Sequence, residues 1–283
     1  MVRLLIKFFL IIYFYFAFKI QKRNLITAFI TNQTKQKWRM HDKLLPNYIK
    51  FVEGYPALLI FDRYLAIADL HIGYEISERE NGIYIPIQKE RYVKRIKELK
   101  DLTGAEELII VGDVKDSIMM PHAEEISELV SVFEEISKLF KITIIQGNHD
   151  AYIDKILRNF ASFAGAEGIV LKNGRAKVAL AHGHARPSDE CMKSSTLVLA
   201  HLHFYIKYEN SKYPVWLVGR KSTKTIILMP PFNDLLSGYY VEDVEATVPF
   251  TDFKLQELKV ITLDGYDLGT LKNLRSIIEE EAD

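Results

Sequence analysis

Five apolar segments of this chain each end in Asp, Asn or His, and this recurrence constrains the fold more than any other feature. The pattern is clearest after the run Ile142–Ile145, which leads into Gly147, Asn148, His149 and Asp150. The run predicts a buried strand, and Gly147 is expected to permit the sharp turn that ends it. The three polar residues would then lie at the carboxyl end of a strand, where open α/β folds bind their ligands.

Four further apolar runs end in the same kinds of residue. These runs are Tyr64–Ala68, Leu108–Val111, Val178–Ala181 and Thr196–Ala200. The motifs that follow them are Asp69-Leu70-His71, Gly112-Asp113-Val114-Lys115-Asp116, His182-Gly183-His184 and His201-Leu202-His203. Each motif taken singly is more often a turn or a structural hydrogen-bonding group. Because every one of them follows a predicted buried strand, the set together predicts one functional site.

In chain order, the motifs D-x-H, G-D-x-x-D, G-N-H-D, H-G-H and x-H-x-H resemble those of the calcineurin-like metallophosphoesterase superfamily. They extend from Asp69 to His203. Ala200 stands where the last motif usually has glycine, which changes only the expected local backbone geometry. Within the superfamily, the chain most resembles the Icc-like phosphoesterases, which are related to DNA-repair nuclease subunits. This narrower likeness rests on the long first inter-motif segment and on the Pro-Pro-Phe-Asn sequence at residues 230–233.

The resemblance implies an α/β fold, a four-layer α-β-β-α sandwich of two mixed sheets. The residues point the same way, because strand and helix patterns alternate in the first half and predict parallel strands with crossover helices. Helices are expected to open at Pro86 and Pro121 and to cover Ala151–Phe160, while Gly73–Ile85 is expected to be a loop. Short apolar runs follow, with a hairpin turn at Asn173-Gly174. They predict a second sheet packed face to face on the first.

Apolar residues at helical spacing identify the expected buried faces. For the helix after Pro86 they are Ile87, Val93, Ile96 and Leu99. For the helix after Pro121 they are Ile126, Leu129, Val130, Phe133, Ile136 and Leu139. A last helix is expected around Leu271, Leu274, Ile277 and Ile278.

The resemblance further implies a centre of two divalent metal ions. It assigns Asp69, His71 and His203 to one ion and Asn148, His182 and His201 to the other, with Asp113 bridging them. Oxygen and imidazole ligands suit Mn²⁺, Fe²⁺, Zn²⁺ or Ni²⁺, and we expect Mn²⁺. Two ions about 3.5–4 Å apart clamp a phosphoryl group and generate hydroxide near neutral pH. That bridging hydroxide would attack phosphorus in line with the leaving oxygen.

Five nearby residues are predicted to have roles other than metal ligation or are left with two alternatives. The family counterpart of His149 contacts the phosphoryl group and protonates the leaving alkoxide, and Asp150 is expected to orient the His149 ring. Asp116 is expected either to hydrogen-bond within its loop or to orient a ligand. His184 is either a substrate-facing or ligand-supporting residue or an ordinary loop histidine. Asn233 either lines the cleft or caps a turn.

The predicted function is therefore hydrolysis of a phosphoester, with phosphodiesters, nucleotides and nucleic acid as candidate substrates. The alternative is a non-catalytic, protein-binding scaffold on the same fold. Loss of His149 or of several ligands would favour the scaffold, and none of these residues is lost. The 37 basic and 37 acidic side chains balance, so composition demands no polyanionic partner. The single cysteine, Cys191, fits a reducing compartment, and a cytoplasmic location is expected.

Residues 1–39 differ from the predicted catalytic domain, residues 40–283. Residues 4–20 are nearly all apolar and reach the short limit for a membrane span, and the Gln-Lys-Arg that follows would be a cytoplasmic flank. Three interpretations remain open. The segment lies upstream of a true start at Met40, it anchors the chain in a membrane through residues 4–20, or it forms an ordinary packed helix.

Overall fold

The first sheet contains six strands that lie side by side in chain order. They are β1 (Ile49–Phe51), β2 (Leu58–Ile60), β3 (Tyr64–Ile67), β4 (Glu107–Val111), β5 (Lys141–Ile145) and β6 (Ala161–Ala164). β1, β2 and β3 pair antiparallel, whereas β3 to β6 are parallel, as the alternating pattern predicted. The computed structural model describes residues 44–208, 211–241 and 247–274.

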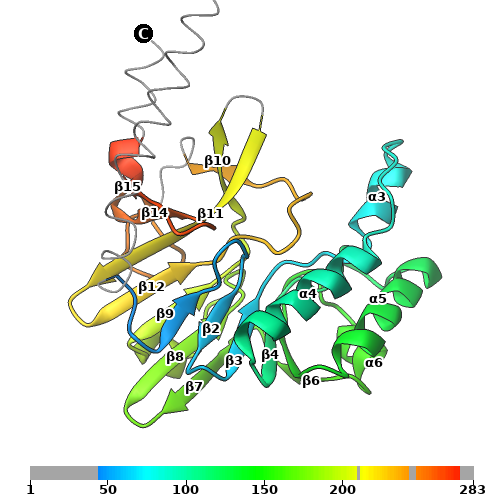
Figure 1. Cartoon of the computed structure of the whole chain (residues 1–283), viewed down its shortest axis with the longest axis horizontal. Helices are drawn as coiled ribbons and strands as arrows, with labels where there is room; N and C mark the ends of the chain where they lie inside the picture. The colour runs from blue at the N-terminus through cyan, green and yellow to red at the C-terminus, as the bar shows by residue number, and fades with distance from the viewer. Residues whose placement is uncertain (1–43, 209–210, 242–246, 275–283) are drawn as a thin grey trace, which may run out of the picture.

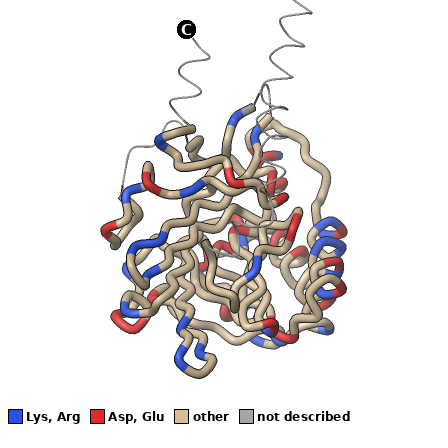
Figure 2. The backbone as a smooth tube through the Cα atoms, turned by 60° about the vertical axis from the view of Figure 1, so that its left-hand side comes forward, with Lys and Arg blue, Asp and Glu red and all other residues tan. Residues whose placement is uncertain are grey.

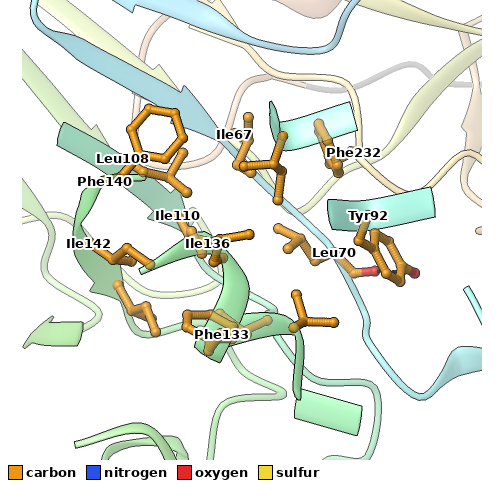
Figure 3. Packing of buried hydrophobic residues seen from close by; sticks show 14 of the residues in the cluster. Ile67, Leu70, Tyr92, Leu108, Ile110, Phe133, Ile136, Phe140, Ile142 and Phe232 are labelled. Atoms are coloured by element: carbon orange, nitrogen blue, oxygen red, sulfur yellow. Dashed lines mark hydrogen bonds between the residues drawn. The ribbon is translucent and has the colours of Figure 1, made fainter. Parts of the chain in front are cut away.

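Helices cover the outer face of this sheet. They are α4 (Lys89–Thr103), α5 (Ala123–Ile136) and α6 (Ile153–Leu157), which lie together at the right of Figure 1. In Figure 3, Phe133 and Ile136 of α5 pack toward Ile110 of β4 and Ile142 of β5, and all four are buried in one hydrophobic cluster. The crossover helices thus bury the outer face of the parallel strands, as expected for βαβ units.

The second sheet contains nine strands. Along its main path the order is β13 (Tyr239–Tyr240), β10 (Phe204–Tyr208), β11 (Ser211–Lys221), β12 (Lys224–Leu228), β9 (Thr196–Leu199), β8 (Ala176–Ala181) and β7 (Ile169–Asn173). Off this path, β11 also pairs with β14 (Lys259–Thr262), which pairs with β15 (Asp267–Thr270). The expected hairpin joins β7 and β8, with Asn173 opposite Ala176. On the outer face, the short α7 (Asp189–Lys193) and the 3₁₀ turn Leu255–Glu257 contribute to a third hydrophobic cluster.

The two sheets pack against each other through a buried cluster drawn from both. Ile60, Ile109 and Val111 of the first sheet meet Trp216 and Val218 of the second in this cluster. The predicted class, two mixed sheets sandwiched between helical layers, is confirmed. The layer outside the second sheet is the thinner one, because its described helices are short.

The segment Gly73–Ile85 is not the loop that we expected, because residues Tyr74–Glu80 form the helix α3. Its only buried residues are Glu75 and Ile76, so it has no apolar periodicity by which the sequence could have predicted it. The next helix, α4, begins at Lys89 rather than Pro86, and Ile87 is 55% exposed. The other expected face residues of α4, Val93, Ile96 and Leu99, are buried.

Two other helices differ from expectation in face or length. The buried face of α5 is rotated toward two acidic residues, Glu125 and Glu128, while Ile126 and Val130 are only partly buried. The helix expected over Ala151–Phe160 shortens to α6, because residues from Ala161 onward extend the sheet as β6.

The two ends of the chain lie largely outside the described residues. The expected last helix is helical over residues 271–274, and its remainder is outside. Residues 1–43 are outside too, so the three interpretations of the N-terminal segment stay open. Within the described part of the chain, no helix is long and apolar enough to cross a membrane.

Candidate metal centre

The first two motifs face each other because their loops stay hydrogen-bonded beyond the ends of β3 and β4. The backbone N–H of Asp69 donates to the carbonyl of Gly112 at 3.1 Å, and that of His71 donates to the carbonyl of Asp113 at 3.0 Å. One residue further, Ile72 donates to Val114 at 2.9 Å. The parallel pairing of the two strands thereby fixes the positions of three predicted ligands, Asp69, His71 and Asp113.

Backbone strain is concentrated at the predicted ligands. Among the described residues, ten non-glycine residues have a positive φ, and five of them are Asp69, His71, Asp113, His201 and His203. Non-glycine residues rarely adopt this left-handed backbone conformation, which costs on the order of 1–3 kcal/mol per residue. Residues held in it are found most often at functional sites. Ala200, which replaces the usual glycine, is not among the ten, so its Cβ fits the local backbone without strain.

Two glycines leave room for the ligands. A Cβ on Gly147 would lie 2.2 Å from Oδ1 of Asp113, and one on Gly112 would lie 2.4 Å from the ring of His182. Gly112 also has φ +80°, whereas the φ of Gly147 is not in the left-handed region. Gly147 is therefore required for close approach to Asp113, and not for the unusual turn that the sequence suggested.

Six of the seven predicted ligands, all but Asn148, gather in two groups of three, and within each group the candidate ligand atoms lie within 4.8 Å of one another. The first group is Asp69, His71 and His203, and the second is Asp113, His182 and His201. Oδ2 of Asp113 lies 3.5 Å from Nε2 of His71 and 3.4 Å from Nε2 of His182. The Asp113 carboxylate thus lies between the groups, as a bridging ligand would.

Three of the histidines are held through Nδ1. The Nδ1 of His71 lies 3.1 Å from Oδ1 of Asp116, and the Nδ1 of His182 lies 2.9 Å from the Nδ1 of His184. The Nδ1 of His203 lies 3.2 Å from the carbonyl oxygen of Ser237. Partners of this kind fix the tautomer and orientation of a metal-binding imidazole. Each ring then presents Nε2 to the centre.

The atoms left without partners fit metal ligation. Among the described residues, Nε2 of His71, Nε2 of His203 and Oδ1 of Asn148 are buried side-chain atoms without a hydrogen-bond partner. Such atoms are costly unless something satisfies them. All three belong to predicted ligands, and oxygen and imidazole donors together suit borderline divalent ions.

Burial and charge act in opposite directions at the centre. Burial raises the pKa of Asp69, but His203 and His182 outweigh it and hold the carboxyl well below its usual range. Burial lowers the pKa of His71, but the neighbouring carboxylates of Asp113 and Asp116 raise it to about 10. Burial and the nearby His182 lower the pKa of His201 to about 4. The His201 ring is thus neutral at neutral pH, which is the form that binds metal ions.

His149 lies beside the first group, with its ring 4.7 Å from that of His71. Its backbone N–H donates to Oδ1 of Asp113 at 2.9 Å, and its ring Nδ1 contacts the carbonyl oxygen of Asp116. A proton on Nδ1 would satisfy that carbonyl and leave Nε2 available to another group.

Asp150 does not have the place that we expected. Its Oδ1 accepts from the N–H of Val114 at 2.8 Å, and its Oδ2 accepts from the N–H of Gly147 at 2.8 Å. Both oxygens are thus engaged by backbone amides, and the carbonyl of Asp116 takes the place of Asp150 at the His149 ring. Asp150 fastens the second motif loop to the third.

In a third cluster, formed by His71, Asp116 and His149, the candidate ligand atoms also lie within 4.8 Å of one another. Here, however, the Asp116 carboxylate is engaged by His71 and by the hydroxyl of Ser77, and His149 contacts its backbone carbonyl. This cluster is a hydrogen-bonded network that supports the first group. Of the two alternatives for Asp116, it fits the orientation of a ligand.

Asn233 and Ser237 come from a segment far from the motifs in sequence. The N–H of Asn233 donates to the carbonyl of Asp69 at 3.2 Å, its Oδ1 accepts from Leu235 at 3.0 Å, and its Nδ2 is buried without a partner. It therefore caps a turn and also lies at the centre. Sequence reasoning missed Ser237, because it contributes only a backbone carbonyl and no side-chain pattern marks it.

The chain is similar to known proteins in its sequence profile and in its fold. A sequence profile described as calcineurin-like phosphoesterase matches residues 62–257, more than half of the chain. Among solved structures, the nuclease MPE of Pseudomonas putida is 18% identical, with a TM-score of 0.51 over 78% of this chain and 100% of that chain. The phosphoesterase Yfce of E. coli is 17% identical, with a TM-score of 0.36 over 73% of this chain and 96% of that chain. The search of curated proteins gave no match.

Proposed function

Because the chain belongs to the calcineurin-like phosphoesterase family, we propose that it is a dinuclear-metal-dependent phosphoester hydrolase. The observation that carries the proposal is the position of Asp113 Oδ2, 3.5 Å from His71 in one ligand group and 3.4 Å from His182 in the other. A carboxylate shared by two groups suits two ions better than one. All the predicted ligands and His149 are retained, so nothing favours the scaffold alternative.

In this proposal Asp69, His71 and His203 hold one ion, and Asn148, His182 and His201 hold the other. Asp113 binds both. Mn²⁺ is the proposed ion, supported by the mixture of oxygen and imidazole donors. When bound, two such ions clamp the phosphoryl group and supply the hydroxide nucleophile.

His149 is the proposed proton donor to the leaving oxygen. The carbonyl of Asp116 holds its ring Nδ1, and the Asp113 carboxylate holds its backbone N–H, so both the ring and the backbone of His149 are held in place. Nε2 then carries the transferable proton when the ring is protonated. A positioned acid of this kind contributes about 10²–10⁴-fold to the rate.

The proposed substrates are small phosphodiesters or single-stranded nucleic-acid ends. The fold shared with the Pseudomonas putida nuclease supports a phosphodiester. Against long duplex, Figure 2 shows Lys and Arg interspersed with Asp and Glu over the backbone, and the formal net charge is +0. Affinity for duplex comes mainly from neutralising phosphates with basic side chains. The proposed location is the cytoplasm, supported by the single, buried Cys191.

A substrate panel tests the function. The metal-free protein, prepared with chelator, is given Mn²⁺ and assayed on a monoester, a small diester, single-stranded DNA and duplex DNA. We expect Mn²⁺-dependent turnover of the diester or the single strand, abolished again by chelator. Absence of metal-dependent hydrolysis on every substrate would contradict an enzyme, and efficient cutting of intact duplex at physiological salt would contradict the substrate class.

A further inference from the structure

We propose that Ser77, on the helix α3, is a positioning residue that acts through Asp116 to fix the ring of His71 for metal binding. This inference rests on the proposed function, since it concerns one ligand of the same centre. It adds a residue that lies outside all five motifs, in the segment that the sequence suggested was a loop.

The contacts form a chain of three side chains. The hydroxyl of Ser77 donates to Oδ2 of Asp116 at 2.5 Å, and Oδ1 of the same carboxylate lies 3.1 Å from Nδ1 of His71. Both oxygens of Asp116 are therefore engaged, one from α3 and one from the ligand. A carboxylate held at both oxygens cannot rotate about its last bond without losing one of them.

The consequence for His71 is a defined tautomer. In the neutral ring, which is the form that binds a metal ion, an acceptor at Nδ1 places the proton there and leaves the lone pair on Nε2. That Nε2 is buried without a hydrogen-bond partner among the described residues and belongs to the group with Asp69 and His203. The Ser77 hydroxyl thus fixes the orientation of the Asp116 carboxylate, whose contact with Nδ1 aims the His71 lone pair at the metal group.

Other contacts hold Asp116 and the helix α3 in place. The backbone N–H of Asp116 donates both to the carbonyl of Ile72 and to Oε1 of Glu125, with the nitrogen 3.1 Å from each oxygen. Because Glu125 lies on α5, this helix also holds Asp116 in place. On α3, Oε1 of Glu75 accepts from the N–H of Gln88 at 2.7 Å. Because Ile76 is the only buried apolar residue of α3, polar contacts supply much of what holds this helix at the site.

A merely structural role makes a different prediction. If Ser77 only fastened α3, its loss would lower stability and leave the His71 ring and its metal affinity unchanged. If Ser77 acts through Asp116, its loss must speed the exchange of the His71 Nδ1 proton with solvent and weaken metal binding. Two readouts other than catalysis therefore decide the question.

The experiment uses the full chain, stripped of metal and titrated with Zn²⁺ by calorimetry, and then examined in the Zn²⁺-loaded form by NMR of the imidazole N–H groups. Removing a direct partner of a metal ligand costs about 10–100-fold in affinity, which we expect for Asp116→Ala. One step further from the metal, Ser77→Ala is expected to weaken the affected site by about 3–10-fold and to speed exchange of the His71 Nδ1 proton. Ser77→Thr, which keeps the hydroxyl, is expected to restore both readouts.

Ser117→Ala is the matched control, because the neighbouring Ser117 hydroxyl is buried but has no hydrogen-bond partner among the described residues. It should leave both readouts unchanged. Ser77→Ala in the Asp116→Ala background should add nothing, since the two residues act as one unit. Unchanged Zn²⁺ affinity and an unchanged His71 proton in Ser77→Ala would overturn the inference, as would full additivity of the two variants. If the wild-type chain bound no Zn²⁺, the proposed function would fail instead.

Discussion

Oδ1 of Asp69 lies 3.0 Å from Nε2 of His182, although 113 positions separate the two residues in the chain. Asp69 follows β3 of the first sheet, and His182 follows β8 of the second. The contact therefore crosses the interface between the sheets. The centre forms only when the sheets pack on each other, so its assembly depends on the buried cluster around Trp216.

Removal of the shared carboxylate tests the arrangement of the two ligand groups. Asp113→Ala should lower the metal content and abolish hydrolysis while the strands remain folded, because the Asp113 carboxylate lies within 3.5 Å of His71 in one group and of His182 in the other. Elemental analysis and circular dichroism measure the two effects. Two ions still bound per chain would remove Asp113 from the bridging role.

Asp150 should act on the stability of the motif loops. Asp150→Ala leaves the N–H groups of Val114 and Gly147 without their carboxylate. Hydrogen bonds to charged groups contribute about 1.5–3 kcal/mol each, partly offset because a buried carboxylate is removed, so we expect a loss of about 2–4 kcal/mol. Urea unfolding measures it, with the exposed Asp154→Ala on α6 as control. A fall in activity without any loss of stability would instead indicate that Asp150 orients the His149 ring.

Glu128 should make stability fall as the pH rises. Burial, followed by the neighbouring carboxylate of Glu75, raises its pKa from 4.5 to about 8. Between these values the folded protein keeps a proton that the unfolded chain has released, so the free energy of unfolding decreases with increasing pH. Glu128→Gln removes this loss and should raise Tm at about pH 9 more than at about pH 4.5. The control is Glu134→Gln, on the exposed side of α5. An equal change in Tm at both pH values would contradict the shifted pKa.

The N-terminal segment should be dispensable for catalysis. All five motifs and both ligand groups lie between Asp69 and His203, so a chain that begins at Met40 should retain full metal-dependent activity. Size-exclusion chromatography and the diester assay measure this. If the shortened chain aggregates while the full chain is active in detergent, the result supports the interpretation that residues 4–20 are a membrane anchor. It contradicts the interpretation that the chain truly starts at Met40.

The strands of the fold could be predicted because apolar runs end in recognisable polar motifs. The expected run Tyr64–Ala68 differs from β3 by one residue, and Ile142–Ile145 differs from β5 by one residue. The strands β1 and β6 were missed because, unlike the similarly short β3 and β9, they do not lead into one of the five motifs. α3 was missed for a different reason, since its polar contacts with Asp116 and Gln88 are tertiary.

At the centre, the sequence predicted which residues gather but not what holds them. The resemblance implied the ligand set, of which all but Asn148 lie in the two ligand groups, whereas the supporting partners Ser237 and Ser77 carry no motif. The place of Asp150 was wrong because a carboxylate next to a histidine in sequence need not face its ring. The turn after Asn148 directs the Asp150 side chain to the amides of Val114 and Gly147.

The rate of the variant His149→Ala tests the central claim most directly. His149 lies beside the first ligand group but outside both, so both metals should remain bound. Hydrolysis of an alkyl phosphodiester should slow by about 10²–10⁴-fold, because the leaving alkoxide loses its proton donor. A nitrophenyl ester, whose leaving group departs without protonation, should lose much less. An undiminished rate on the alkyl ester, with both metals bound, would contradict the account.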